Sequence, residues 1–205
     1  MNVTNAANNM IGGTALGARN VISANGFGGA FNPNAGVAIG GSGATGNHVE
    51  GNFIGTDASG TSALGNNVAG VTVAGPGNFV GGLTAAQRNV ISGNAGSGVF
   101  LFSADAIDNH IEGNYVGTNA AGAIGLGNAR SGIAVDGGTD NLVGGTSLAA
   151  RNVVSGNSGN GIFVLAENTT IQGNFIGLNP SGSAGLGNAF YGVQIHGAAN
   201  ALIGG

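Results

Sequence analysis

Short runs of apolar residues, separated by Gly and Asn, recur along the whole chain at regular intervals. The pair Gly-Val or Gly-Ile returns at steps of 34, 28, 34, 29 and 31 residues. Each interval holds three apolar runs of the length expected for short strands bounded by tight turns. Apolar residues do not recur at the 3.6-residue spacing of a helix, and Gly interrupts every stretch. The pattern therefore predicts strands throughout and no helix.

Two successive intervals form a longer repeat of about 62 residues. The pair Arg-Asn marks it, because it begins at Arg19 and returns at Arg88 and Arg151. Three short strands per interval, repeated at similar length, predict a solenoid in which each coil buries its apolar residues only against its neighbours. We therefore expect an all-β parallel β-helix of about six coils, with three short strands per coil, as a single domain over residues 1–205.

Like residues then lie above like residues at the strand spacing of about 4.8 Å. Two columns of β-branched residues are expected to point inward, where such side chains pack well on a pleated surface. The first column is Ile11, Val49, Val80, Ile111, Val143, Ile171 and Ile203. The second column is Ile22, Ile54, Ile91, Val116, Val154 and Ile176.

A column of Asn is expected at the start of the third strand of each coil. Stacked Asn side chains can hydrogen-bond along the axis as a ladder, and Asn tolerates left-handed backbone conformations. We interpret the column as an internal structural ladder, with an outward row that binds sugar or ice as the alternative. Its members are Asn20, Asn52, Asn89, Asn114, Asn152 and Asn174.

Charged residues make up only 6% of the chain, against roughly 25% in a typical soluble domain. The net charge of −4 and the absence of a basic run argue against nucleic acid as a partner. No apolar stretch approaches the roughly 18 residues of a membrane helix. Because no basic region followed by an apolar one occurs near residue 1, we expect no signal peptide. The absence of Cys excludes disulfides and thiolate metal sites.

Glu50 and Glu112 are the strongest candidates for acid–base chemistry. They are expected two coils apart, or about 9.6 Å, near the upper limit for the carboxylates of inverting glycosidases. That spacing follows from the repeat alone, so we expect both on a solvated face. His48 beside Glu50, and His110 beside Glu112, could each offer two ligands to an ion, but the two pairs lie too far apart to share one. We therefore expect no catalytic, cofactor-binding or metal residues, and no enzyme.

Arg19, Arg88 and Arg151 recur every second coil. They could form a ridge that grips an acidic polysaccharide, or each could hold its loop by donating to carbonyl oxygens; we favour the second interpretation. The coils that carry a long loop also carry an aromatic residue in the third strand. We expect the leucines of those loops to fold over the aromatic residues. The aromatic residues are Phe53, Tyr115 and Phe175, and the leucines are Leu64, Leu126 and Leu186.

Four large apolar residues should point outward from the first strand of their coils: Phe100, Phe102, Phe163 and Leu165. They form a possible contact patch unless a neighbouring loop covers them. The equivalent outward positions in other coils are too irregular for the flat Thr or Asn row of an ice-binding solenoid.

Several phrases resemble the right-handed parallel β-helix repeats of large bacterial surface and secreted proteins. They are RNVISGN from Arg88, GNFIGTD from Gly51, LGN from Leu64 and NFVGG from Asn78. The resemblance covers essentially the whole chain and implies a right-handed helix that serves as a stalk or adhesive array. Pectate lyases, polygalacturonases and phage tailspikes resemble the chain in architecture only, since their catalytic signatures are absent.

Met1–Val3 aligns with a first strand, and the chain closes inside a recurring IGG, so we expect both ends of the helix to lack caps. The segment is either cut from a longer array or a subunit that stacks end to end, since uncovered coils are sheet edges. The leading hypothesis is a structural segment of a bacterial extracellular or cell-surface protein, acting as stalk, adhesin scaffold or filament subunit. The alternatives are a polysaccharide-binding or polysaccharide-degrading protein and an ice-binding solenoid. Expected partners are further copies, end to end or side by side, and glycans.

Overall fold

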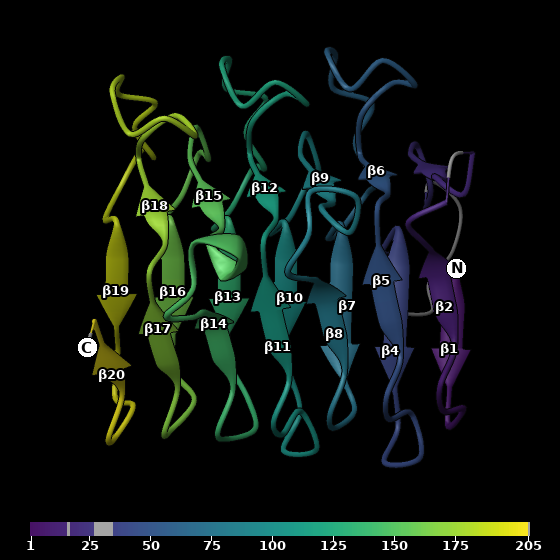
Figure 1. The fold of residues 1–205 in the computed structure, drawn as a ribbon. Helices are drawn as coiled ribbons and strands as arrows, with labels where there is room; N and C mark the ends of the chain where they lie inside the picture. The colour runs from purple at the N-terminus through teal and green to yellow at the C-terminus, as the bar shows by residue number, and fades with distance from the viewer. Residues whose placement is uncertain (16, 27–34, 205) are drawn as a thin grey trace.

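The computed structural model describes residues 1–15, 17–26 and 35–204. Its strands form three parallel sheets that run the length of a solenoid of about six coils, which confirms the expected fold. Each coil contributes one strand to each sheet, so every third strand is a neighbour (Figure 1). The N- and C-termini lie at opposite ends of the stack (Figure 1).

The first sheet, called sheet A, has seven strands in the order of the chain: β1 (Asn2–Thr4), β4 (Val37–Gly40), β7 (Val71–Ala74), β10 (Val99–Leu101), β13 (Ile133–Val135), β16 (Ile162–Val164) and β19 (Val193–Ile195). Sheet B also has seven: β2 (Met10–Gly12), β5 (His48–Glu50), β8 (Phe79–Gly81), β11 (His110–Glu112), β14 (Leu142–Gly144), β17 (Thr170–Gln172) and β20 (Leu202–Ile203). Sheet C has six shorter strands: β3 (Val21–Ile22), β6 (Phe53–Ile54), β9 (Val90–Ile91), β12 (Tyr115–Val116), β15 (Val153–Val154) and β18 (Phe175–Ile176).

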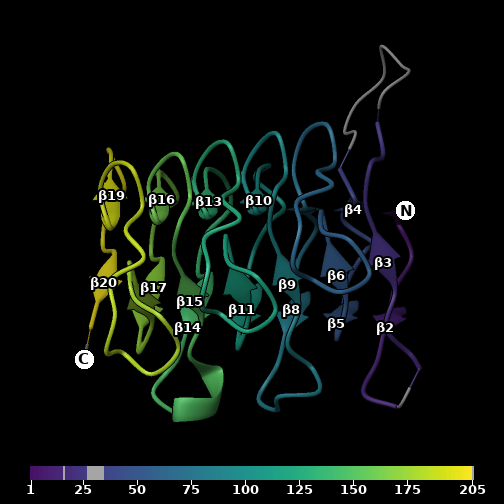
Figure 2. The ribbon, with the colours of Figure 1, turned by 90° about the horizontal axis from the view of Figure 1, so that it is seen from above.

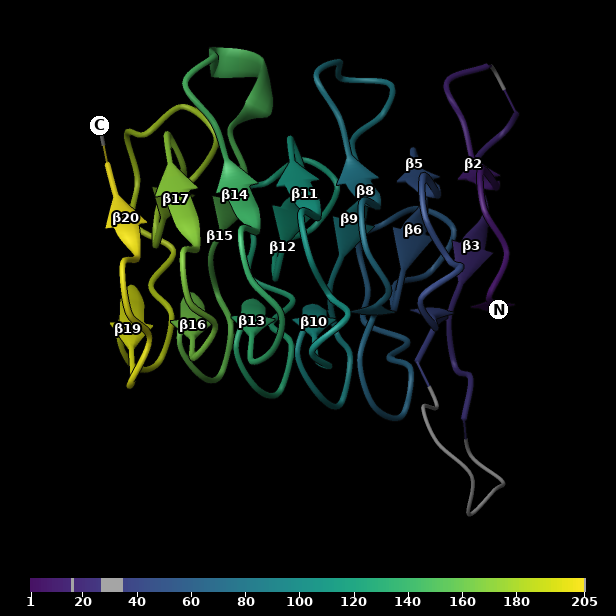
Figure 3. The same cartoon turned by 90° about the horizontal axis from the view of Figure 1, so that it is seen from below.

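The strands are only two to four residues long, and most of those in sheet B end at a Gly or immediately before one. The one helical element in the described ranges is the single 3₁₀ turn η1 (Leu148–Ala150), which lies in a loop between sheets B and C (Figure 3). The Ser147 side chain caps that turn by accepting a hydrogen bond from the Ala150 backbone N–H. No described helix is therefore long enough to cross a membrane.

The core is one continuous column of aliphatic side chains inside the coils. Both predicted inward columns are confirmed: their central members, such as Val49, Ile91 and Val116, are fully buried. Ile203, at the C-terminal end of the first column, is more exposed because the described residues place no further coil above it, whereas Ile11 at the other end is still buried. Burial of these β-branched residues in a repeated register is the main force that holds the coils together.

Candidate functional site

Asn ladders at the three corners of the coil are the most regular polar feature of the protein. The predicted ladder is confirmed and lies between sheets B and C. In it, the backbone N–H and the Nδ2 of each Asn both donate to the Oδ1 of the Asn in the next coil. The bonds join Asn20, Asn52, Asn89, Asn114, Asn152 and Asn174 in that order.

Two further ladders were not anticipated from the sequence. One lies between sheets A and B, and the other between sheets C and A. The first joins Asn9, Asn47, Asn78, Asn109 and Asn141. The second joins Asn25, Asn66, Asn94, Asn128, Asn157 and Asn188. Successive members of the ladder between sheets C and A lie 41, 28 and 34 residues apart.

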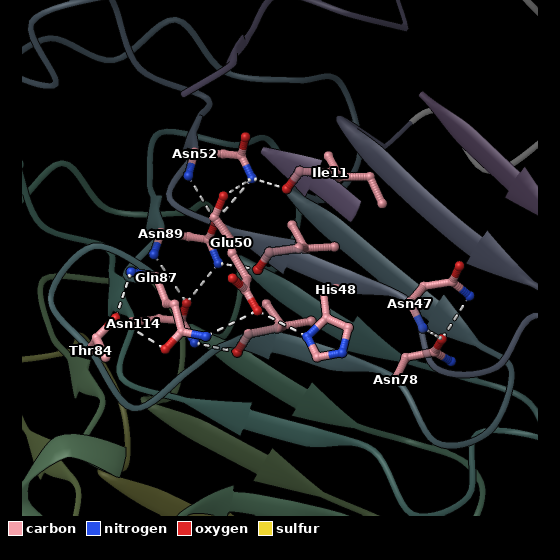
Figure 4. A network of polar contacts seen from close by, with 12 residues as sticks. Ile11, Asn47, His48, Glu50, Asn52, Asn78, Thr84, Gln87, Asn89 and Asn114 are labelled. Atoms are coloured by element: carbon pink, nitrogen blue, oxygen red, sulfur yellow. Dashed lines mark hydrogen bonds and ion pairs between the residues drawn. The ribbon is translucent and has the colours of Figure 1, made fainter. Parts of the chain in front are cut away.

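The side-chain amide of Asn89 shows that both its oxygen and its nitrogen are engaged in hydrogen bonds (Figure 4). Its Oδ1 accepts from the backbone N–H and the Nδ2 of Asn52, at 3.0 and 3.2 Å. Its Nδ2 donates to Asn114 Oδ1 at 2.9 Å and to the Val49 carbonyl oxygen at 2.7 Å. Asn89 is fully buried, so the ladder is internal and cannot present a row of amides to sugar or ice.

The expectation that Glu50 lies on a solvated face is wrong. Glu50 lies outward on sheet B, but it is not solvated. Only 3% of the residue is exposed. Gln87, from a loop of the next coil, donates its Nε2 hydrogen to Glu50 Oε1 at 3.1 Å, and His48 Nδ1 lies 2.9 Å from the same oxygen (Figure 4). The Thr84 hydroxyl in turn donates to Gln87 Oε1. The carboxylate is therefore covered by protein and engaged in internal contacts.

The two histidines of sheet B flank an aromatic ring from the coil between them. The Phe79 ring lies 4.6 Å from the His48 ring and 5.1 Å from the His110 ring, centroid to centroid. His110 Nδ1 lies 3.4 Å from Glu112 Oε1, so each histidine contacts its own glutamate. Within the described ranges, no group of three or more metal-ligating side chains comes together. The column therefore offers two separate His–Glu pairs and no assembled metal centre.

The arginines of the repeat hold their loops, as favoured from the sequence, and also cover the aromatic residues of sheet C. Arg88 Nε donates to the Gly113 carbonyl oxygen of the next coil at 3.2 Å, and its guanidinium lies 4.3 Å from the centre of the Tyr115 ring. Equivalent contacts join Arg19 to Phe53 and Arg151 to Phe175. An ammonium or guanidinium over an aromatic face is attracted by the negative face of the ring.

The expectation that the loop leucines cover these rings is wrong for Leu64, which is 51% exposed. A guanidinium occupies one side of the ring, and the loop glycines Gly60, Gly122 and Gly182 lie directly against the aromatic residues. The long loops therefore do cover the aromatic residues, with glycine backbone and the Ala120 side chain. These loops project on one side of the solenoid (Figure 1).

One residue organises each long loop. The Asp57 carboxylate accepts hydrogen bonds from the Ser59 hydroxyl and from the backbone N–H groups of Thr61 and Ser62. These bonds, the Ser59 hydroxyl foremost, lower the pKa of Asp57 below its ordinary value. Asn119 makes the equivalent backbone contacts in its own loop.

The predicted patch lies on the outward face of sheet A. Phe100 and Phe102 are half-buried and their rings stack at 5.3 Å. Phe163 is also half-buried, and Leu165 is 37% exposed. Between the strands of Phe100 and Phe163 runs β13, which carries the small residue Ala134. A groove of about 400 Å³ forms there. In Figure 2 the strands β10, β13 and β16, which carry these residues, are seen nearly end-on and side by side.

Comparison with protein-family models, with curated proteins and with solved structures finds no match for this chain. The interpretation of its surfaces therefore rests on their own geometry.

Proposed function

We propose that the chain is a structural segment of an extracellular protein: a stiff spacer in a stalk, adhesin scaffold or filament. The observation that carries this proposal is the continuous aliphatic core enclosed by three Asn ladders. Each ladder bonds coil to coil at spacings between 2.8 and 3.3 Å, so side chains reinforce the strand pairing at every corner. The extracellular location rests on the resemblance of the repeat phrases to those of bacterial surface proteins.

The contacts of the acidic residues favour this role over polysaccharide cleavage. Glycoside hydrolysis requires two carboxyl groups that face one bond of the substrate. Glu50 is covered by Gln87 and bonded to His48, so it cannot reach a substrate without rearrangement. Its counterpart Glu112 is bonded to His110 in the same way. The carboxylates of Glu50 and Glu112 thus bond to neighbouring side chains on the surface of sheet B.

A spacer has to hold its ends at a fixed distance, and this can be measured. Asn2 and Gln194 lie in one column of sheet A, six strand steps apart. At about 4.8 Å per step, their backbones are roughly 29 Å apart. The chain has no Cys, so Asn2→Cys and Gln194→Cys introduce two unique spin-label sites. Double electron–electron resonance should give one narrow distance distribution; a broad one, like that of the urea-unfolded control, would reject the spacer.

A filament role has a specific observation in its favour, the polarity of the ladders. Among the described residues, Asn20 and Asn25 at the N-terminal end have Oδ1 atoms that accept no hydrogen bond. Asn174 and Asn188 at the other end have backbone N–H groups that donate none within the same part of the chain. One end therefore offers acceptors and the other donors, as head-to-tail stacking of copies requires.

The unequal numbers of strands in the three sheets argue in part against this stacking. Sheets A and B each have seven strands and sheet C has six, so a copy that continues sheets A and B leaves sheet C one strand short. Light scattering over a concentration series, with negative-stain images, tests whether copies of the chain stack end to end. Rods that lengthen with concentration would support the filament, whereas a constant monomer mass would remove it and leave the spacer.

A further inference from the structure

A hollow of about 410 Å³ lies over the outward face of sheet C, and the charged groups that line it are positive. They are Arg19 and Arg88, which come shortly before β3 and β9. These strands are two steps apart in sheet C, or about 9.6 Å, so one ligand between the arginines can reach both. We call this site the sheet C hollow. Its other lining residues are neutral: Phe53, Ala58, Ser59, Ala85, Val90 and Ala120.

Each of the two arginines keeps most of its hydrogen-bond donors available. A guanidinium carries N–H groups on Nε and on both Nη atoms, and holding the loop uses only Nε: it donates to a carbonyl oxygen of the next coil at 3.2 Å in Arg19 and in Arg88. Within the described ranges, the Nη atoms make no hydrogen bond. The guanidinium carbons lie 4.0 and 4.3 Å from the centres of the Phe53 and Tyr115 rings. These contacts fix the donors in place before a ligand arrives, which lowers the entropy lost on binding.

No described acidic side chain forms an ion pair with these arginines. The ion pairs within the described ranges all join a histidine to a carboxylate. Asp57 bonds to Ser59 at the hollow but does not itself line it, and its oxygens already accept hydrogen bonds from Ser59, Thr61 and Ser62. A concave site lined by one sign of charge concentrates ions of the opposite sign. The sheet C hollow therefore attracts anions, although the whole chain has a net charge of −4.

We propose that the sheet C hollow binds a dianionic oxyanion group of the phosphate type, held by the Nη–H donors of Arg19 and Arg88. A guanidinium bonds such a group through paired N–H···O contacts, and two guanidiniums balance its two negative charges. A monoanion leaves one positive charge unbalanced, and a cation is repelled by both arginines. The same contacts suit a free phosphate ion and a phosphate ester of a sugar. The site is independent of the spacer role, because no ladder residue lines it.

The test is a titration of the ¹⁵N-labelled chain followed by two-dimensional NMR of the arginine Nε–H groups, of which the chain has four. At about pH 7, above the second pKa of phosphate monoesters near 6, inorganic phosphate should shift the signals of Arg19 and Arg88 in a saturable way. Acetate at the same ionic strength should bind at least about tenfold more weakly, because it carries one negative charge. Glucose 6-phosphate is titrated in parallel. Tighter binding than that of inorganic phosphate identifies a sugar ester as the ligand, and weaker binding identifies the free ion.

Arg88→Gln should weaken phosphate binding at least about tenfold, since it removes charge-assisted hydrogen bonds. Arg151→Gln is the matched control. Arg151 covers Phe175 and donates to a carbonyl oxygen in the same way, but it does not line the hollow. Its replacement should change the affinity by no more than about twofold.

Ala85→Glu keeps the test decisive if an arginine variant folds poorly, because Ala85 is exposed and lines the hollow. The added carboxylate should abolish phosphate binding, whereas Ala85→Gln, with a side chain of the same shape and no charge, should retain most of it. The proposal is overturned if phosphate causes no saturable shift, or if acetate binds as tightly as phosphate. It is also overturned if Arg88→Gln and Arg151→Gln weaken binding equally.

Discussion

Replacing Asn89 with Ala tests the ladder at its best-buried part. The substitution removes four side-chain hydrogen bonds, two accepted from Asn52 and two donated to Asn114 and Val49. It leaves the buried backbone N–H of Asn52 without an acceptor, which costs about 1–3 kcal/mol. The lost donation to the Val49 carbonyl oxygen adds about 1 kcal/mol, and the small void left by the amide adds about 1 kcal/mol more.

We therefore expect Asn89→Ala to lower the free energy of unfolding by about 3–5 kcal/mol, a large share of the roughly 5–15 kcal/mol of a typical domain. Asn20→Ala is the matched control, because Asn20 is exposed at the start of the same ladder and only donates to Asn52. It should cost about 1 kcal/mol or less. Urea unfolding followed by circular dichroism measures both variants. Equal losses for Asn89→Ala and Asn20→Ala would refute the claim that the buried rungs stabilise the stack.

Three further variants probe the corners, the arginines and the long loops. Gly81→Ala places a Cβ 2.0 Å from the Glu112 carbonyl oxygen of the next coil, in a backbone with φ +88°. Urea unfolding should therefore show a loss of at least about 3 kcal/mol in the free energy of unfolding. Gly185→Ala is the control and should be near neutral, because its Cβ meets open space. Arg88→Ala loses the contact with the Tyr115 ring and one hydrogen bond, and calorimetry should show a loss of about 1–2 kcal/mol; an unchanged melting temperature would contradict it. Asp57 has a lowered folded-state pKa, so its ionised form adds stability above pH 3.8, and this stability is lost as the pH falls through the folded-state pKa. The wild type should therefore be more stable to unfolding than Asp57→Asn near neutral pH and equally stable in acid. A difference in unfolding free energy that stays constant at all pH values would be inconsistent with this cause.

The fold could be predicted because a solenoid uses the same register in every coil. Once Val49, Val80 and Ile111 were aligned by the repeat, their common inward direction followed, and so did the ladder that begins at Asn20. The ladder through Asn66 and Asn94 was missed although the predicted ladder is spaced as unevenly, at 32, 37 and 25 residues for its first members. It was missed because the repeat was aligned on the apolar runs and these Asn residues lie in the turns between them. An alignment of coil corners, in place of apolar runs, would have brought it out.

The surface was harder to predict because it depends on contacts between loops and coils. The covering of Glu50 requires Gln87 to arrive from a loop of the next coil, and no spacing in the sequence encodes that approach. In the same way, the guanidinium of Arg19 lies 4.0 Å from the centre of the Phe53 ring while Leu64 stays exposed, and a planar cation is attracted by the face of an aromatic ring. The groove beside Phe163 was partly foreseen, since the outward position of Phe163 was predicted.

Hydrogen exchange at the backbone amides of Asn52, Asn89 and Asn114 tests the central claim most directly. These N–H groups donate to side-chain Oδ1 atoms of the next rung, so their protection reports the ladder separately from strand pairing. The account predicts that they exchange as slowly as the amides of the buried strands, because the ladder opens only when the coils separate. Exchange at the rate of the exposed loop amides would show that the amide stacks do not lock the coils together, and the stiff spacer would lose its physical basis.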